Sequence, residues 1–170
     1  DFKVTFTFVV PPILIALVRS PLADKYDLST IKSFASGAAY LSKELCQMVN
    51  KRYGISITDG YGMTETSPIV SLQTQNDLSL NKLNVGRLVS NTEAQIIDMN
   101  TNKLLGPNEI GEIWIRGPQV MLGYLKNDEA NAKTFIPHAN DKDRFLRSGD
   151  IASIDENGYI TLHDRVKDII

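Results

Sequence analysis

The groups best suited to chemistry stand together in one stretch, Asp59-Gly60-Tyr61-Gly62-Met63-Thr64-Glu65-Thr66. Glycines on both sides of Tyr61 let the backbone take a positive φ or approach another group closely. The side chains suit a nucleotide, with Tyr61 to stack on a base, Thr64 to contact phosphate and Glu65 to hold a magnesium ion shared with the phosphates. A tight turn around a core tyrosine is the simpler interpretation, because the stretch lacks the third glycine of the dinucleotide-binding fingerprint.

The residues next to this stretch predict how it is positioned. The apolar run Ile55-Ser56-Ile57-Thr58 predicts a short strand that ends where the stretch begins, and Pro68 stops any helix after it. Open α/β sheets bind ligands at the carboxyl ends of their strands. We therefore expect the stretch to form a ligand-binding loop.

Composition and charge exclude several classes of protein. A chain of 170 residues, 42% hydrophobic and 22% charged, is long enough for one domain with a sizeable core. A net charge of −2 and a pI near 5.7 give no electrostatic case for binding nucleic acid or an anionic membrane. The longest apolar stretch, residues 6–18, is shorter than the roughly 20 residues of a membrane span and is split by Pro11-Pro12. Cys46 is the single cysteine, which excludes an internal disulfide and a thiolate metal cluster.

The first half of the chain has the pattern of alternating strands and helices. Alternating side chains predict a strand over residues 2–10, and the prolines after it can open a helix. A second helix has apolar residues at helical spacing and Gly54 as its C-terminal stop. The expected elements are a strand over 2–10, a helix over 11–18, a strand over 31–35, a helix over 42–53 and a strand over 55–58. This order predicts the end of a parallel α/β sheet over residues 1–80.

The second half, residues 81–165, has the pattern of short strands. Residues 73–83 are polar and predicted to be loop, and turn signals separate the segments that follow. Asp155-Glu156-Asn157-Gly158 predicts a hairpin, and Asn127 or Asp128 would cap a helix over 128–135. The expected strands are 94–97, 111–116, 150–154 and 159–162. The fold class predicted for the whole is α/β, with a β-meander or distorted-barrel region after the parallel sheet.

One further motif precedes the first stretch and four follow it in order, and together they resemble a known family. They are Ser36-Gly37-Ala38-Ala39, Gly111-Glu112-Ile113-Trp114-Ile115-Arg116-Gly117, Met121-Leu122-Gly123-Tyr124, Ser148-Gly149-Asp150 and Asp164-Arg165-Val166-Lys167-Asp168. The series is similar to the adenylate-forming enzymes, and within them to the acyl-CoA synthetases around 4-coumarate–CoA ligase and firefly luciferase. The resemblance covers essentially the whole chain. It implies the latter part of a large N-terminal domain, with residues 166–170 at the start of a hinge to a C-terminal domain.

The resemblance implies a role for each matching position. Thr64 and Glu65 would be catalytic, with Glu65 on magnesium, and Tyr61 would lie against adenine. Asp150 would accept the ribose hydroxyls and Arg165 would contact the ribose. The implied ATP- or AMP-binding residues are Gly37, Ala38, Asp59, Gly60, Tyr61, Gly62, Thr64, Asp150, Arg165 and Lys167, of which Lys167 is also the hinge. The implied substrate pocket is Gly37, Ala38, Gly60, Pro68 and Ile69.

Simpler structural roles stand beside these expectations. Asp150 would otherwise cap a hairpin, and Arg165 would pair with Asp164 at a solvated strand end. Residues 111–117 and 121–124 are expected to be scaffold, with Trp114 in the core and Gly117 and Gly123 in turns. His138 and His163 suggest no role, and their distance in sequence argues against a histidine metal site.

Some positions depart from the family pattern. Tyr40 replaces a proline, Ser148 replaces a threonine, and Asp59 stands where the 4-coumarate group often has glutamine. A carboxylate at position 59 would repel an acidic substrate unless it turns away. The acid that is activated is therefore left open.

The implied activity is that of an ATP-dependent acid–CoA ligase, with a carboxylic acid, ATP and coenzyme A as small-molecule partners and magnesium as cofactor. The acid attacks the α-phosphate to form acyl-AMP, and the thiol of coenzyme A then displaces AMP. The alternatives are a luciferase-like oxygenase, a peptide-synthetase adenylation enzyme and a non-catalytic nucleotide-binding protein. The resemblance leaves the compartment open between cytoplasm and peroxisome. The chain alone is expected to be inactive, because the family's phosphate loop and C-terminal catalytic lysine are not in it.

Overall fold

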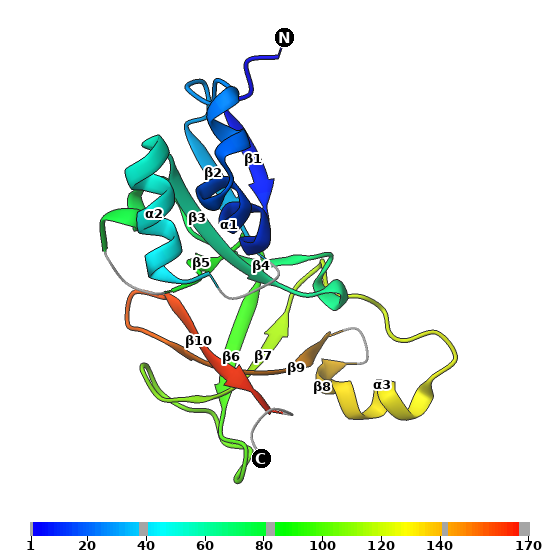
Figure 1. Ribbon diagram of the computed structural model, residues 1–170. Helices are drawn as coiled ribbons and strands as arrows, with labels where there is room; N and C mark the ends of the chain where they lie inside the picture. Colours follow the sequence, from blue (N-terminus) through cyan, green and yellow to red (C-terminus); the bar gives the residue numbers. More distant parts are fainter. Residues whose placement is uncertain (1, 38–40, 81–83, 141–142, 167–170) are drawn as a thin grey trace.

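The N-terminal sheet begins with parallel strands, as the sequence predicts. The computed structural model describes residues 2–37, 41–80, 84–140 and 143–166 (Figure 1). In it, β1 (Phe6–Val9), β2 (Ser33–Ser36) and β3 (Ser56–Gly62) pair in parallel, and β4 (Ile69–Leu72) and β5 (Arg87–Leu88) extend the sheet antiparallel in the order β1-β2-β3-β4-β5. β1 is shorter than the predicted 2–10, since it is an edge strand whose partner β2 is equally short.

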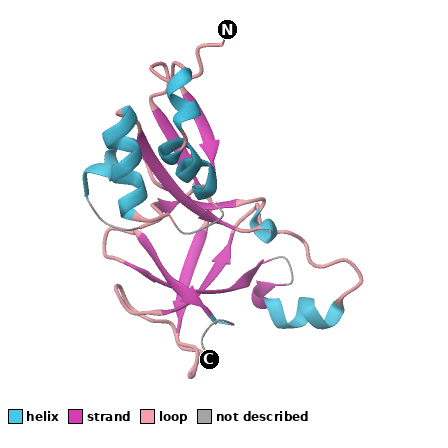
Figure 2. Cartoon of the chain, in the orientation of Figure 1, coloured by secondary structure: helices cyan, strands magenta, loops and turns pink. Residues whose placement is uncertain are grey.

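Both predicted helices of this half are confirmed, and they cover one face of the parallel strands (Figure 2). α1 (Pro11–Arg19) starts on the prolines. α2 (Lys43–Tyr53) is capped by Ser42, whose Oγ accepts a hydrogen bond from the Leu45 N–H at 3.2 Å, and it ends at Gly54 with φ of 69°. The buried core between helices and strands consists of Leu14, Phe34, Leu41, Leu45, Val49, Ile55 and Ile57.

The prediction that β3 ends at Thr58 is wrong. The strand continues to Gly62, because Gly60, Tyr61 and Gly62 pair antiparallel with β4, with a bulge between Tyr61 and Gly62. Two short 3₁₀ helices, η2 (Thr64–Thr66) and η3 (Gln75–Leu80), follow β3 and β4, and η1 (Pro21–Lys25) follows α1. The predicted loop over 73–83 thus contains a turn of helix in its described part.

The second half forms an open antiparallel sheet. β6 (Glu93–Ile97), β7 (Gly111–Arg116), β9 (Asp143–Ile154) and β10 (Ile160–Arg165) lie in the order β10-β9-β7-β6, and β8 (Phe135–Asn140) pairs with β9. Among the described residues β6 and β10 do not pair with each other, so the sheet is a meander and not a closed barrel. The hairpin over 155–158 is confirmed, and so is the predicted helix, α3 (Asp128–Thr134), which Asn127 caps.

The two sheets share one apolar core, which places the end of β3 beside β9 and β10. The core takes Tyr61, Val70 and Val85 from the first sheet and its connections, and Ile96, Ile113, Ile115, Ala152 and Ile160 from the second. Backbone bonds join the halves, since the Val85 N–H donates to the Ile160 carbonyl at 2.8 Å and the Ile160 N–H donates to the Gly86 carbonyl at 2.9 Å. The chain passes from the first sheet to the second between Leu88 and Glu93. The division of the chain at residue 80 stays a prediction.

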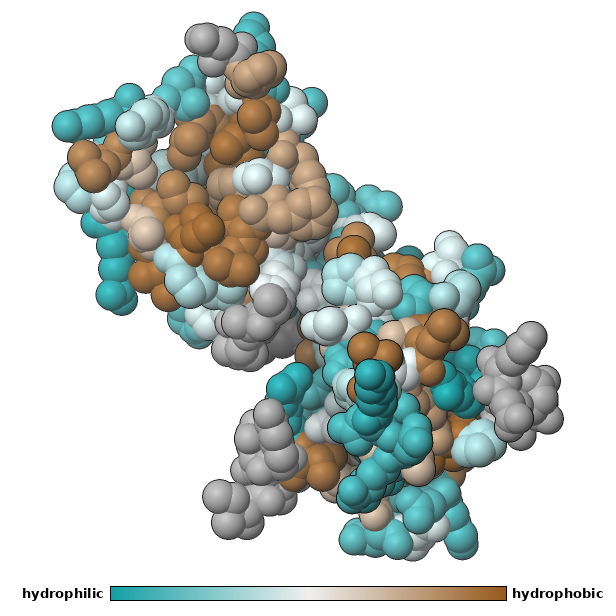
Figure 3. Space-filling view, turned by 90° about the vertical axis from the view of Figure 1, so that its right-hand side faces the viewer, coloured by the Kyte–Doolittle hydropathy of each residue, from teal (hydrophilic) through white to brown (hydrophobic). Residues whose placement is uncertain are grey.

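Hydrophobic side chains gather on the surface of the part built on the N-terminal sheet (Figure 3). Phe6, Phe8 and Ile13 are among the exposed large apolar residues there. In the described ranges, none of the helices combines the length and hydrophobicity of a bilayer span.

Candidate functional site

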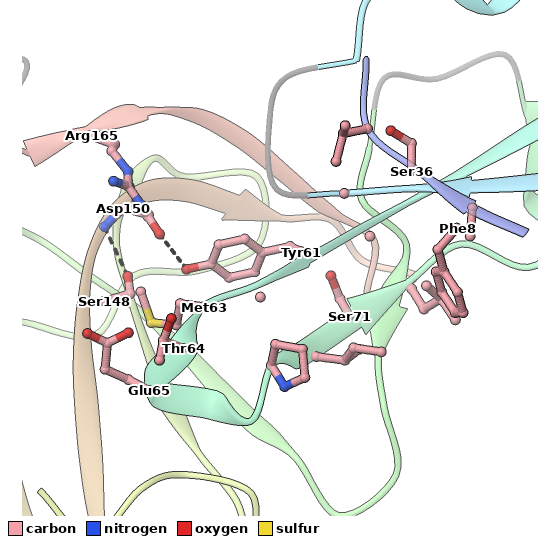
Figure 4. A pocket seen from close by; sticks show the side chains of 18 of the residues that line it. Phe8, Ser36, Tyr61, Met63, Thr64, Glu65, Ser71, Ser148, Asp150 and Arg165 are labelled. Atoms are coloured by element: carbon pink, nitrogen blue, oxygen red, sulfur yellow. Dashed lines mark hydrogen bonds and ion pairs between the residues drawn. The ribbon is translucent and has the colours of Figure 1, made fainter. Parts of the chain in front are cut away.

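A cavity of about 1070 Å³ lies where the two sheets meet. One end is apolar and is lined by Phe8 and Val9 of β1, Ile13 of α1, and Val10 between the two elements. The other end is polar, and Figure 4 shows Thr64, Glu65, Ser148, Asp150 and Arg165 on that side of Tyr61. The cavity thus connects an apolar compartment with a cluster of hydroxyl and charged groups.

Asp150 is the centre of the polar end. Its carboxylate is buried and accepts a hydrogen bond from the Tyr61 hydroxyl at 2.7 Å on Oδ2, while Arg165 Nε donates to Oδ1 at 2.8 Å. Arg165 and Asp150 are register partners on β10 and β9, which explains why the side chains meet. The guanidinium therefore pairs with Asp150, and Asp164 instead accepts the backbone N–H of Arg165.

Tyr61 is both a core residue and part of the cavity wall. Its ring packs in the shared core, and its hydroxyl reaches Asp150. Burial, followed by the neighbouring Asp150 charge, raises the pKa of Tyr61, so the hydroxyl stays protonated and donates. The nucleotide-binding and core-tyrosine interpretations are therefore compatible in this fold.

Glu112, which sequence analysis assigned to scaffold, holds the turn that presents Asp150. Its buried carboxylate accepts the Gly149 N–H on Oε1 at 3.1 Å, and Arg147 Nη2 and Trp114 Nε1 on Oε2 at 3.0 and 2.9 Å. Ser148 completes the turn, because its hydroxyl oxygen accepts the Asp150 N–H at 3.0 Å. In the sequence, the signal for this role was the presence of an acidic residue, Glu112, inside an otherwise apolar strand.

The prediction that Trp114 is core is wrong. The ring is only half-buried, and its N–H donates to Glu112. The Arg147 guanidinium lies 5.6 Å from the ring centroid, so the tryptophan supports the Glu112–Arg147 pair.

Glycine at 62 is required by close approach and not by a positive φ, and the space beside Gly60 is also tight. A Cβ on Gly62 would lie 1.8 Å from the Pro68 carbonyl oxygen, and one on Gly60 would lie 3.0 Å from the Ser71 carbonyl oxygen. Thr66 then closes the turn of η2, since its buried hydroxyl donates to the Pro68 carbonyl at 2.7 Å. Thr64 and Glu65 are thereby held at the cavity wall.

Glu65 fits the requirements of a magnesium ligand. It lines the cavity, and one carboxylate oxygen, Oε1, accepts a hydrogen bond from Tyr124 at 2.8 Å. The described residues contain no cluster of three or more His, Cys, Asp or Glu side chains. Magnesium bound together with phosphates typically uses only one or two protein carboxylates, so a single glutamate suffices.

The predicted substrate-pocket residues Gly37, Gly60, Pro68 and Ile69 line the cavity. Ser36 lines it as well, and its buried hydroxyl has no hydrogen-bond partner in the described structure. Ala38 and Lys167 lie outside the described residues, as does Tyr40. Sequence analysis missed the apolar end formed by residues 8–10 and 13, because a hydrophobic strand carries no signal for which face lines a cavity.

Asp59 is not among the described residues that line the cavity. Its carboxylate accepts the Gly60 N–H at 2.9 Å, and burial raises its pKa to about 6. Burial, and then the charge of Asp59, raises the pKa of Cys46 on α2 to about 11. Asp59 thus lies outside the described cavity lining, and its contact with the nucleotide stays a prediction.

Comparisons with known proteins agree with this geometry. The family described as AMP-binding enzyme matches residues 1–125. The chain is 42% identical over 171 aligned residues to a probable 4-coumarate–CoA ligase 3 of Dictyostelium discoideum, and 40% identical to a luciferin 4-monooxygenase of Photuris pensylvanica. These alignments cover 99% and 100% of this chain but 30% of each relative.

Among solved structures, a long-chain-fatty-acid–CoA ligase of Archaeoglobus fulgidus superposes with a TM-score of 0.84 at 31% identity, covering 96% of this chain and 34% of the ligase. The chain thus spans about a third of the length of the proteins it matches.

Proposed function

Since the chain belongs to the family of AMP-binding enzymes, we propose that it is part of an ATP-dependent acid–CoA ligase. Such an enzyme activates a carboxylic acid as acyl-AMP and then transfers the acyl group to coenzyme A. Similarity to a probable 4-coumarate–CoA ligase and to a fatty-acid–CoA ligase supports the proposal. The observation that carries it is the cavity, in which the Tyr61–Asp150–Arg165 cluster faces an apolar compartment.

In this proposal Asp150 accepts the hydroxyl groups of the ribose. An ionised carboxylate has about four lone-pair sites, so the bonds from Tyr61 and Arg165 leave acceptor capacity for ligand hydroxyls. Arg165 forms an ion pair with the buried carboxylate and contacts the nucleotide beside it. Tyr61 and the glycines around it form the wall on which the adenine packs.

Thr64 and Glu65 act on the phosphates. Magnesium, when bound, would offset the charge that develops on the α-phosphate as the acid attacks. Glu65 would hold the ion, and the Thr64 hydroxyl would donate to a phosphate oxygen. Because no protein nucleophile is needed, positioning and charge stabilisation are the main contributions of these residues.

The acyl part of the substrate would occupy the apolar end of the cavity. Phe8, Val9, Val10 and Ile13 line that end, and none of them carries a charge. Because Asp59 is not among the described lining residues, the acid is expected to have an apolar body behind its carboxylate.

The test uses the full-length enzyme with a panel of aliphatic and aromatic carboxylic acids. We expect acid-dependent exchange of pyrophosphate into ATP, followed by an acyl-CoA product when coenzyme A is added. Absence of acid-dependent exchange across the panel contradicts the proposal. A luciferase-like oxygenase is the second candidate, because a luciferin 4-monooxygenase is about as similar. It predicts exchange with luciferin followed by light emission in oxygen.

A further inference from the structure

The loop between β7 and α3 contacts Glu65 at two points. The Met121 N–H donates to the main-chain carbonyl of Glu65 at 2.8 Å, and the Tyr124 hydroxyl donates to its Oε1 at 2.8 Å. No other donor in the described ranges reaches the Glu65 carboxylate. One short segment therefore holds both the backbone and the carboxylate of this residue.

Tyr124 is itself fixed by α3. The Asn131 side-chain amide accepts the Tyr124 N–H on Oδ1 at 2.7 Å and donates from Nδ2 to the Tyr124 carbonyl at 3.0 Å. Gly123 has a φ of 147°, and a Cβ there would lie 2.8 Å from Asn131 Oδ1. Glycine at 123 therefore allows the amide to close on the main chain of Tyr124. Asn131 belongs to the first turns of α3, which Asn127 caps.

The consequence is a donor whose position is set by the backbone. A phenol is protonated at neutral pH, so Tyr124 is a hydrogen-bond donor to Glu65. A glutamate side chain loses rotamer freedom when it binds a metal ion. Fixing the side chain in advance reduces the conformational entropy that is lost on binding. With Oε1 occupied by the phenol, Oε2 is the oxygen left for another ligand.

We propose that Tyr124 is a positioning residue for Glu65, orienting the carboxylate so that its second oxygen can bind the magnesium ion that accompanies ATP. This inference rests on the proposed function. It assigns a purpose to the Met121–Tyr124 motif, which sequence analysis treated as scaffold, and it makes α3 part of the support of the site.

A second tyrosine in the chain provides a matched control, which tests whether the role of Tyr124 is purely structural. The Tyr159 hydroxyl donates to a carboxylate oxygen of the buried Asp77 at 2.7 Å, and neither residue lines the cavity as described. Tyr159→Phe thus removes the same kind of hydrogen bond without touching the site. Thermal unfolding of each variant reports whether its fold is intact.

The experiment measures Mn²⁺, which binds the same oxygen ligands as Mg²⁺. Free Mn²⁺ is followed by electron paramagnetic resonance in the full-length enzyme with saturating ATP, and ATP binding without metal is followed by calorimetry. Tyr124→Phe should weaken Mn²⁺ binding about tenfold, the effect expected from the loss of one hydrogen bond to a charged group. Asn131→Ala should weaken it in the same direction, while Tyr159→Phe should match wild type. Metal-free ATP binding should be unchanged in all variants.

Wild-type Mn²⁺ affinity in a folded Tyr124→Phe enzyme would overturn the inference and leave the proposed function standing. If Tyr124→Phe does not fold, Asn131→Ala decides, and an unchanged affinity in it overturns the inference. Equal losses in Tyr124→Phe and Tyr159→Phe also overturn it, because the effect would then be one of general stability. If the unsubstituted enzyme binds no Mn²⁺ with ATP, both the inference and the proposed function fail.

Discussion

Asp150 is a buried carboxylate with a tyrosine hydroxyl on one oxygen and an arginine on the other. Such a group is costly to bury unless its charge is compensated, and Arg165 provides the compensation. The arrangement keeps the side chain in one orientation before a ligand arrives. At the scale of single residues, the site thus depends on charges whose partners come from distant parts of the chain.

Asp150→Asn in the full-length enzyme should weaken ATP binding by about 10- to 100-fold, because a hydrogen bond to a charged group is worth about 1.5–3 kcal/mol. Calorimetric titration with ATP measures the change. Asp98→Asn is the control, since Asp98 is a loop carboxylate outside the described cavity lining. Equal affinities for wild type and Asp150→Asn would remove Asp150 from the nucleotide site.

Asp59 predicts a pH dependence of stability. Its pKa is raised by burial from 3.8 to about 6 in the folded chain, so between these values the folded state binds more protons than the unfolded state. The free energy of unfolding should therefore fall as pH rises from about 4 to about 6, by about 2–3 kcal/mol for a shift of this size. Above that window the penalty is constant.

Urea unfolding of the full-length enzyme at a series of pH values measures this effect. The difference in stability between Asp59→Asn and wild type should grow in favour of the variant across the window, because asparagine does not titrate. Parallel stability profiles for the two proteins would show that Asp59 does not hold its proton.

At the scale of elements, the antiparallel pairing of β3 with β4 positions the polar end of the site. β3 leaves the parallel sheet at Asp59, pairs antiparallel with β4, and turns into η2, which carries Thr64 and Glu65. The Gly62 backbone and the Pro68 carbonyl are too close for a side chain. The position of both proposed catalytic residues therefore depends on a contact between strands.

Gly62→Ala should open this contact and lower the melting temperature of the full-length enzyme strongly, because its Cβ would lie 1.8 Å from the Pro68 carbonyl oxygen. Overpacking of this kind typically costs about 1–3 kcal/mol, and backbone displacement adds to it. Gly37→Ala is the matched control for stability, since a Cβ there meets only the Gly60 carbonyl oxygen at 3.8 Å. Differential scanning calorimetry compares the two, and equal melting temperatures would contradict the argument.

At the scale of the whole molecule, the two sheets enclose a site with little positive charge. Arg165 is the one cationic side chain among the described residues that line the cavity, and Glu65 and Asp150 are acidic. A triphosphate needs cations to offset its charge, both when it binds and in the transition state. Under the proposed function, these cations would come from metal ions and from residues outside the described cavity lining.

The chain of residues 1–170 by itself is therefore expected to show no adenylation. The measurement is release of pyrophosphate from ATP and magnesium in the presence of the acid panel, with the full-length enzyme as the positive control. Steady release by the isolated chain would show that these residues supply the necessary charge alone.

Local signals in the sequence were sufficient for most elements and for the family. Ser42 and Gly54 bound α2, and Asp155–Gly158 turns the β9–β10 hairpin, because caps and turns depend on residues a few positions apart. The ordered motifs indicated the family for the same reason, because each motif is a short run of consecutive residues.

Only the tertiary structure decided how these pieces meet. The extension of β3, the Tyr124–Glu65 bond and the support of Asp150 by Glu112 all join segments that are distant in sequence. Such contacts are decided by strand register and by which face each element buries, and a one-residue change of register reverses every side chain. The amino-acid sequence indicates candidate residues of the site, and the packing of two sheets determines which of them touch.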